Sequence, residues 1–292
     1  MYVSAVYSHS GLSSFENCPR QFQYRYVLKL EVKTESVEAF LGKLVHEVLE
    51  RLYQFVGEGR VPKLPQVLSR FEQWWLERFD PARVRVVRSE VPVHFYRETG
   101  LRCLSRFYRR RYPFDEDTTL GLEEMVHFSL DEAGLYRMRG VIDRIARARD
   151  GAVEIHDYKT GKRVPNQERI DQDRQLALYQ IGVAERFGAD AKVRLIWHYL
   201  AADVVRSSTR TAEQLGALRD KTMRLIDRVE AESDYPARPT VLCGWCEYRE
   251  LCPASGATVR PAVETPGTEA LAVEAPATKA TAAEAPAAAL PG

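Results

Sequence analysis

Residues 153–159 read Val-Glu-Ile-His-Asp-Tyr-Lys, and an Asp150-Gly151 turn precedes them. The segment is predicted to be a β-strand. Because side chains of a strand alternate between its two faces, Asp157 and Lys159 share one face and lie about 7 Å apart along the strand. The Asp-x-Lys pattern alone is common, and a surface ion pair on a half-exposed strand is its simpler explanation.

A second carboxylate is expected close to Asp157. Asp143 lies on the preceding predicted strand, and antiparallel pairing across the turn would bring it beside Asp157. Two converging carboxylates form a hard oxygen site suited to Mg²⁺ or Mn²⁺. A neighbouring lysine can orient an attacking water or neutralise charge on a phosphate, so Lys159 is a candidate catalytic residue.

Three further polar residues lie on predicted helices. His46 is well away from the apolar stripe of its helix, and Gly42 leaves space one turn earlier. Such a histidine can bind a metal through a neutral ring nitrogen, although a solvated surface histidine fits equally well. Gln175 and Tyr179 are four residues apart on a later helix and point the same way, which a polar edge of a packed helix also explains.

The order of the predicted elements indicates the fold class. Strands are expected at about 120–130, 136–147, 153–159 and 192–200, and helices at about 36–56, 66–79, 96–112, 170–187 and 212–232. A three-strand meander followed by a helix and a strand predicts one α/β domain with a mixed sheet over residues 1–254. Residues 255–292 are rich in Ala, Pro, Thr and Glu and contain no aromatic residue, which predicts a disordered tail.

The chain has five cysteines, of which three are closely spaced as Cys243-x2-Cys246-x5-Cys252. Cys18 is a possible fourth ligand from the other end of the folded part. Four thiolates suit either a tetrahedral zinc ion or an iron–sulphur cluster, and the spacing does not separate the two. Cys103 is expected to be a free structural thiol.

Composition excludes several classes of function. The 42 Lys plus Arg against 41 Asp plus Glu give a net charge of +1, which excludes histone-like binding of nucleic acid. No run approaches the ~18 apolar residues of a membrane span, and no signal peptide is visible, so a cytoplasmic protein is expected. The absence of a Gly-x4-Gly-Lys-Ser/Thr motif excludes an ATP-driven helicase within this chain.

Taken together, six motifs resemble the RecB-type branch of the PD-(D/E)XK nucleases, and more narrowly its iron–sulphur members such as the AddB nuclease domain and the CRISPR-associated adaptation exonucleases. The motifs are Cys18-Pro19-Arg20-x-Phe22, Gly42-x3-His46-Glu47, Gly140-Val141-Ile142-Asp143-Arg144, Asp157-Tyr158-Lys159-Thr160-Gly161, Gln175-x3-Tyr179 and the three-cysteine group at 243–252. Each is weak alone, but all six occur in the family's order.

The resemblance implies a restriction-endonuclease-like αβββαβ core, with a helical insertion at about 62–115 that shapes the DNA path. It implies that His46, Asp143, Asp157 and the Tyr158 carbonyl bind the metal, and that Lys159, Gln175 and Tyr179 complete the catalytic site. It also implies a [4Fe–4S] cluster on Cys18, Cys243, Cys246 and Cys252, which would join the two ends of the folded part and is favoured over zinc.

The expected function is therefore a Mg²⁺- or Mn²⁺-dependent deoxyribonuclease, acting as an exonuclease on single-stranded DNA or duplex ends in DNA repair or recombination. A separate helicase or adaptation complex is a possible partner, and a non-catalytic DNA-end-binding or scaffolding subunit is the alternative function. Four arginines are candidate phosphate contacts, with a solvated helix face as the other explanation for the first three: Arg109, Arg110, Arg111 and Arg144.

Overall fold

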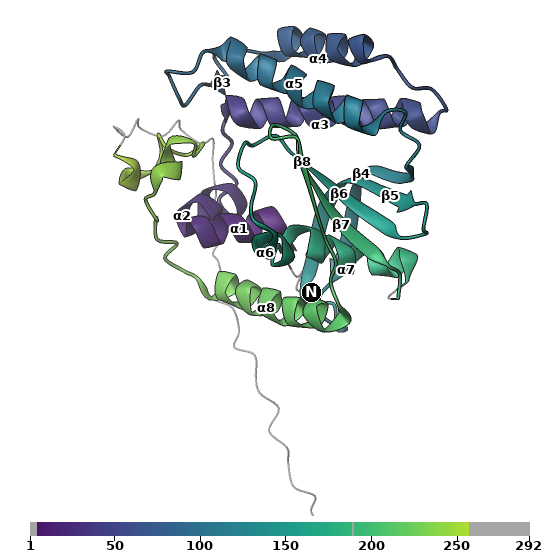
Figure 1. Ribbon diagram of the computed structural model, residues 1–292. Helices are drawn as coiled ribbons and strands as arrows, with labels where there is room; N and C mark the ends of the chain where they lie inside the picture. The colour runs from purple at the N-terminus through teal and green to yellow at the C-terminus, as the bar shows by residue number, and fades with distance from the viewer. Residues whose placement is uncertain (1–4, 189, 257–292) are drawn as a thin grey trace, which may run out of the picture. The chain divides into compact units, whose positions relative to one another are not determined.

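A computed structural model describes residues 5–188 and 190–256, and most of the tail predicted at 255–292 therefore lies outside the described residues. The described part is built around one mixed β-sheet with helices on both faces (Figure 1). The predicted α/β class is thus confirmed. None of the helices in these residues is long and apolar enough to cross a membrane.

The sheet is assembled around the predicted meander. Its neighbouring strands run in the order β1-β5-β6-β7-β8, and β4 pairs with β5. The β1–β5 and β6–β7 pairs are parallel, whereas the other three pairs are antiparallel. The bounds are Val6–Ser8 (β1), Asp117–Ser129 (β4), Arg137–Ala148 (β5), Val153–Lys159 (β6), Val193–Tyr199 (β7) and Val204–Ser208 (β8).

One face of the sheet packs against helices from both ends of the chain. Apolar side chains of β4, β5, β6 and β7 form a core with the helices α1, α7 and α8. These helices are His9–Asn17, Gln175–Phe187 and Ala212–Ala231, and the short helices Pro19–Phe22 (α2) and Gln167–Asp171 (α6) accompany them. A turn of π-helix, Gln23–Val27, extends α2, and two 3₁₀ turns, Val241–Gly244 and Pro253–Ser255, lie near the end of the described chain.

A second helical layer covers the other face. The helices α3 (Val37–Gly57), α4 (Leu64–Arg78) and α5 (Val93–Arg111) pack together and enclose a separate core that reaches Tyr158 and Leu200 at the sheet. Two short strands, Glu35–Ser36 (β2) and Val84–Arg85 (β3), form a small parallel pair beside it. Ser36 caps α3 by accepting a hydrogen bond from the Ala39 N–H, so the predicted start of this helix is observed.

Two features of the fold differ from the prediction. The helix expected at about 170–187 is divided: α6 ends at Asp171 and α7 begins at Gln175, where the Asp173 carboxylate accepts the Leu176 N–H at 3.4 Å. The strands β1, β2, β3 and β8 are additional, and all four are short. Their signals are weak in sequence because strands of two to five residues carry little alternation.

Candidate active site

The predicted residue His46 lies on α3 and faces the end of β6. Its Nε2 donates a hydrogen bond to the Tyr158 carbonyl at 2.8 Å, and its Nδ1 lies 3.5 Å from Asp143 Oδ2. A Cβ on Gly42 would lie 3.5 Å from Thr160 Oγ1, so the helix runs close to the loop that follows β6. The structure therefore brings together three of the predicted metal-binding groups.

Asp143 is the most strongly perturbed carboxyl of this site. Its Oδ2 accepts the Tyr158 N–H at 2.8 Å, which fixes the carboxylate at the point where β5 and β6 separate. Burial raises the pKa of Asp143 to about 7; the His46 ring and the Tyr158 N–H oppose the rise, and the charges of Asp157 and Glu123 add to it. A group with these surroundings gains from a nearby cation.

Glu123 on β4 is a member of the site that the sequence did not indicate. Single ligand atoms of His46, Glu123 and Asp143 all lie within 4.8 Å of one another. Glu123 has φ +44°, a left-handed conformation that interrupts the strand alternation. The only signal in the sequence is an acidic doublet within a predicted strand, and alternation alone could not have assigned it to this face.

Asp157 and Lys159 form a second group next to the cluster. Lys159 Nζ donates to Asp157 Oδ1 at 2.9 Å and to Gln175 Oε1 at 3.0 Å, so strand β6 and helix α7 hold the ammonium between them. Burial lowers the pKa of Lys159, but contact with Asp157 and the charge of Asp143 outweigh this and raise it overall. The lysine is therefore cationic at neutral pH.

Tyr179 packs beneath β5 instead of pointing into open space. A Cβ on Gly140 would lie 2.2 Å from Tyr179 Cε1, so only glycine allows the ring this position. Burial raises the pKa of Tyr179; a hydrogen bond with Gln175 opposes that rise. The predicted pair Gln175 and Tyr179 thus lies on one side of α7, with Gln175 on the lysine and Tyr179 against the sheet.

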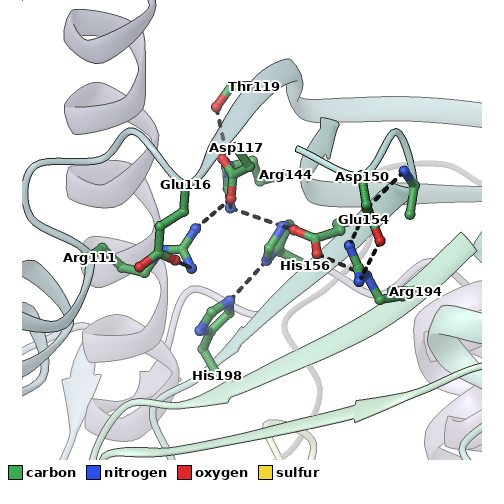
Figure 2. A network of polar contacts seen from close by, with 11 residues as sticks. Arg111, Glu116, Asp117, Thr119, Arg144, Asp150, Glu154, His156, Arg194 and His198 are labelled. Carbon is green, nitrogen blue, oxygen red and sulfur yellow. Dashed lines mark hydrogen bonds and ion pairs between the residues drawn. The ribbon is translucent and has the colours of Figure 1, made fainter. Parts of the chain in front are cut away.

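Arg144 does not contact DNA as the sequence analysis expected, because it is fully buried. Its Nη1 and Nη2 donate to Asp117 at 2.6 and 3.0 Å, and Nη2 also donates to His156 Nε2 at 2.9 Å (Figure 2). The guanidinium lies 4.2 Å from the centre of the Tyr53 ring. The side chain joins β4, β5, β6 and α3 below the active site, out of reach of a phosphate.

The buried histidines in Figure 2 have defined hydrogen-bond roles. Arg144 can only donate, so His156 Nε2 accepts and His156 Nδ1 donates to His198 Nε2 at 2.9 Å. Burial lowers the pKa of both rings well below the usual range, and the Arg144 charge lowers that of His156 further. Both histidines are therefore neutral parts of the core.

The three consecutive arginines at the end of α5 have different surroundings. Arg111 pairs with Glu116 and Asp117 and is mostly buried, and Arg110 pairs with Asp203. Arg109 is exposed. The positive charges of Arg110 and Arg111 are therefore largely neutralised within the fold, and Arg109 is the member of the group that is most accessible to a phosphate.

The four predicted cysteine ligands line one cavity of about 240 Å³. The Arg238 N–H donates to Cys18 Sγ at 3.5 Å, and the Thr240 N–H donates to Cys243 Sγ at 3.3 Å. Within residues 5–188 and 190–256, no three cysteine thiols come within 4.8 Å of one another. Cys103 is buried in α5, apart from these four.

A histidine on α3 and carboxylates of the mixed sheet, with a lysine close by, form a group that could hold a divalent metal. The chain belongs to the PD-(D/E)XK nuclease superfamily, whose family model matches residues 6–253. This family uses divalent metals and acts on nucleic acid, and the fold is consistent with it. The elements α3, β4, β5, β6, α7 and β7 follow one another in αβββαβ order, with α4, β3 and α5 between α3 and β4 and the short α6 before α7.

Two solved structures are similar to this chain. One is the crystal structure of SSO0001, with 15% identity and a TM-score of 0.41 over 87% of this chain and 88% of that one. The other is a candidate exonuclease from Eubacterium rectale, with 12% identity and a TM-score of 0.47 over 90% of this chain and 91% of that one. A search of curated proteins finds no match.

Proposed function

We propose that the protein is a Mg²⁺- or Mn²⁺-dependent deoxyribonuclease that hydrolyses phosphodiester bonds. The observation that carries this proposal is the cluster of His46, Glu123 and Asp143 immediately beside the Asp157–Lys159 pair. Carboxylate oxygens with one imidazole suit Mg²⁺ or Mn²⁺, and the nitrogen ligand favours Mn²⁺ as a strong activator.

The residues fit a divalent cation in their charges as well as in their positions. Burial raises the pKa values of both Asp143 and Glu123; His46 opposes the rise, and neighbouring carboxylates add to it. His46, Asp143, Glu123 and the Tyr158 carbonyl would bind the ion, with Asp157 as a further ligand. When bound, the ion would polarise the phosphodiester and lower the pKa of a coordinated water.

Lys159 supplies the fixed positive charge of the proposed mechanism. Gln175 and Asp157 hold its Nζ from two sides, so the ammonium needs little reorganisation when charge develops on a phosphate oxygen. Asp157 in turn keeps the lysine protonated. In-line attack by water would release the 3′ oxygen and leave a 5′-phosphate, with Gln175 and Tyr179 keeping α7 against the site.

We further propose that the substrate is single-stranded DNA or a duplex end, cut by an exonuclease during DNA repair or recombination. A separate helicase or adaptation complex would deliver the DNA, since this chain has no phosphate-binding loop for ATP. The family membership supports a nucleic-acid substrate, and the motif order supports the RecB-type branch.

The test is Lys159→Ala in single-turnover assays with Mn²⁺ on end-labelled and circular single-stranded DNA. Loss of the ammonium should reduce the cleavage rate by about 10²–10³-fold while DNA binding persists. Cleavage of the linear substrate alone would identify an exonuclease. Unchanged cleavage by Lys159→Ala would overturn the assignment, and absence of cleavage by the wild type would favour the non-catalytic end-binding alternative.

We also propose that Cys18, Cys243, Cys246 and Cys252 bind a [4Fe–4S] cluster. A tetrahedral zinc site with Zn–S bonds of about 2.3 Å would bring its thiolates to about 3.8 Å from one another. No three of these four thiols lie within 4.8 Å of one another, although all four line one cavity. A cubane cluster accepts a wider spacing because each thiolate binds a different iron.

Such a cluster would reinforce contacts that already join the two ends of the folded part. Arg25 Nε donates to Glu247 at 2.8 Å, and the Tyr24 hydroxyl donates to the Leu251 carbonyl at 3.4 Å. Anaerobically purified protein should be brown and contain iron and sulphide, and Cys246→Ser should lose both. A colourless protein with stoichiometric zinc would contradict the proposal.

A further inference from the structure

Beyond the cluster of His46, Glu123 and Asp143, part of the sheet face on the α3 side is left exposed by the helices of residues 5–188 and 190–256. The side chains of Val126 and Phe128 on β4 and of Met138 and Ile142 on β5 are buried in the core on the α7 side of the sheet. Because side chains of a strand alternate, the neighbouring odd-numbered residues of these strands face the opposite side. On that side β4 and β5 present three cross-strand pairs: Met125 with Val141, His127 with Arg139, and Ser129 with Arg137. We call these six residues the outer strip.

The outer strip is exposed and chemically mixed. Met125 is 50% exposed and Val141 is 36% exposed, although both are apolar and lie directly opposite each other. His127, Arg137 and Arg139 are also exposed. An exposed apolar pair, Met125 and Val141, next to two arginines is unusual for a sheet face in contact with solvent, where polar residues normally occupy such positions.

The outer strip is continuous with the proposed catalytic cluster. Val141 is two residues from Asp143 on β5, and Met125 is two residues from Glu123 on β4. At about 3.3 Å per residue, the strip begins about 7 Å from the cluster and extends to roughly 20 Å from it at Arg137. A chain of nucleotides that leaves the cluster along these strands would therefore lie over the strip.

We propose that the outer strip binds the single-stranded DNA adjoining the bond that is cut, an inference that rests on the proposed function. Bases would pack on Met125 and Val141, whose polarizable and apolar surfaces accept any base. Arg139 and Arg137 would contact the phosphates, which gives the strip the charge that a DNA strand requires. The outer strip would thus bind single-stranded DNA without preference for its sequence.

The test is binding of a fluorescein-labelled oligo(dT) of twelve nucleotides, followed by fluorescence anisotropy with Mn²⁺ in a Lys159→Ala background that prevents cleavage. The double substitution Met125→Glu and Val141→Glu should weaken binding by at least about tenfold. Val205→Glu on β8 is the matched control, because Val205 is a strand valine of 37% exposure outside the strip. It should bind as the parent protein does.

Two further measurements separate binding from folding. Arg139→Gln should lower the slope of log K against log salt by about 0.7, the value for one phosphate contact on a single strand. All variants should have the same melting temperature as the parent protein. If the variant with Met125→Glu and Val141→Glu melts at a lower temperature, the milder double substitution Met125→Ser and Val141→Ser replaces it in the binding assay. Affinity for oligo(dT) that is equal in the strip variants and the parent would overturn the proposal.

The inference and the proposed function can fail separately. If the wild type cuts DNA but the strip variants bind it as tightly as the parent, only the inference is wrong. If the wild type does not cut DNA while the strip variants lose affinity, the outer strip binds single-stranded DNA but the proposed function is wrong. If the parent does not bind single-stranded oligo(dT), the inference is overturned irrespective of cleavage.

Discussion

Arg144→Met should destabilise the protein without directly affecting a DNA contact. The substitution keeps a long apolar side chain but removes the guanidinium that bonds to Asp117 and His156 (Figure 2). Asp117 would then be a buried carboxylate with Arg111 as its remaining cationic partner, and His156 Nε2 would lose its donor.

The expected magnitude follows from the burial of both partners. Removing one partner of a buried ion pair typically costs about 3–5 kcal/mol. Because Arg111 still pairs with Asp117, we expect the lower end, about 3 kcal/mol, in the free energy of unfolding. For a domain of this size that corresponds to a fall in Tm of about 6–12 °C.

The assay is urea unfolding and thermal melting, followed by circular dichroism, with a matched control. Arg149→Met removes an arginine beyond the end of the same strand whose side chain is 72% exposed and pairs with Asp115, so it should change stability by no more than about 0.5 kcal/mol. A double-mutant cycle with Asp117→Asn should give a coupling of at least about 1 kcal/mol.

The opposite result would restore the interpretation drawn from the sequence. Suppose that Arg144→Met has the same melting temperature as the wild type but binds DNA more weakly and with a smaller salt dependence. Arg144 would then contact a phosphate, and the buried network would not hold its side chain.

Three more predictions concern the site. Burial raises the pKa of Asp143 to about 7, so below that pH a proton competes with the metal for this carboxylate. The Mn²⁺ affinity, measured by calorimetry, should therefore rise by up to about tenfold per pH unit towards pH 7 and then level off. Asp143→Asn should abolish this pH dependence. Glu123→Gly should raise the stability of the metal-free protein by about 0.5–1 kcal/mol, because the φ of +44° at this position suits glycine. The same substitution should weaken Mn²⁺ binding. If Glu123→Ala stabilises the protein equally, the gain comes from removal of the charge and not from relief of backbone strain. Gly140→Ala should destabilise the protein by about 1–3 kcal/mol, because the new Cβ would clash with the Tyr179 ring. Adding Tyr179→Ala should remove much of that penalty. If the effects of the two substitutions are additive, the contact is absent.

Local sequence determined the framework of the protein. The strand at 153–159 was predicted to the residue, since its turn, length and alternation are local properties. The order of strands and helices then fixed a mixed α/β sheet. Motif spacing also singled out His46, Asp143, Asp157, Lys159 and Gln175, which the fold brings into one region. Their assignment as catalytic residues stays a prediction.

Only the tertiary structure decided what surrounds these residues. Arg144 and the exposed arginine Arg139 are alike in sequence, but pairing with Asp117 buries the first and leaves the second on an open sheet face. Glu123 joins the cluster through a left-handed backbone conformation that no periodicity encodes. Burial and this backbone conformation depend on residues far apart in the chain, and for that reason they appear only when the strands pair.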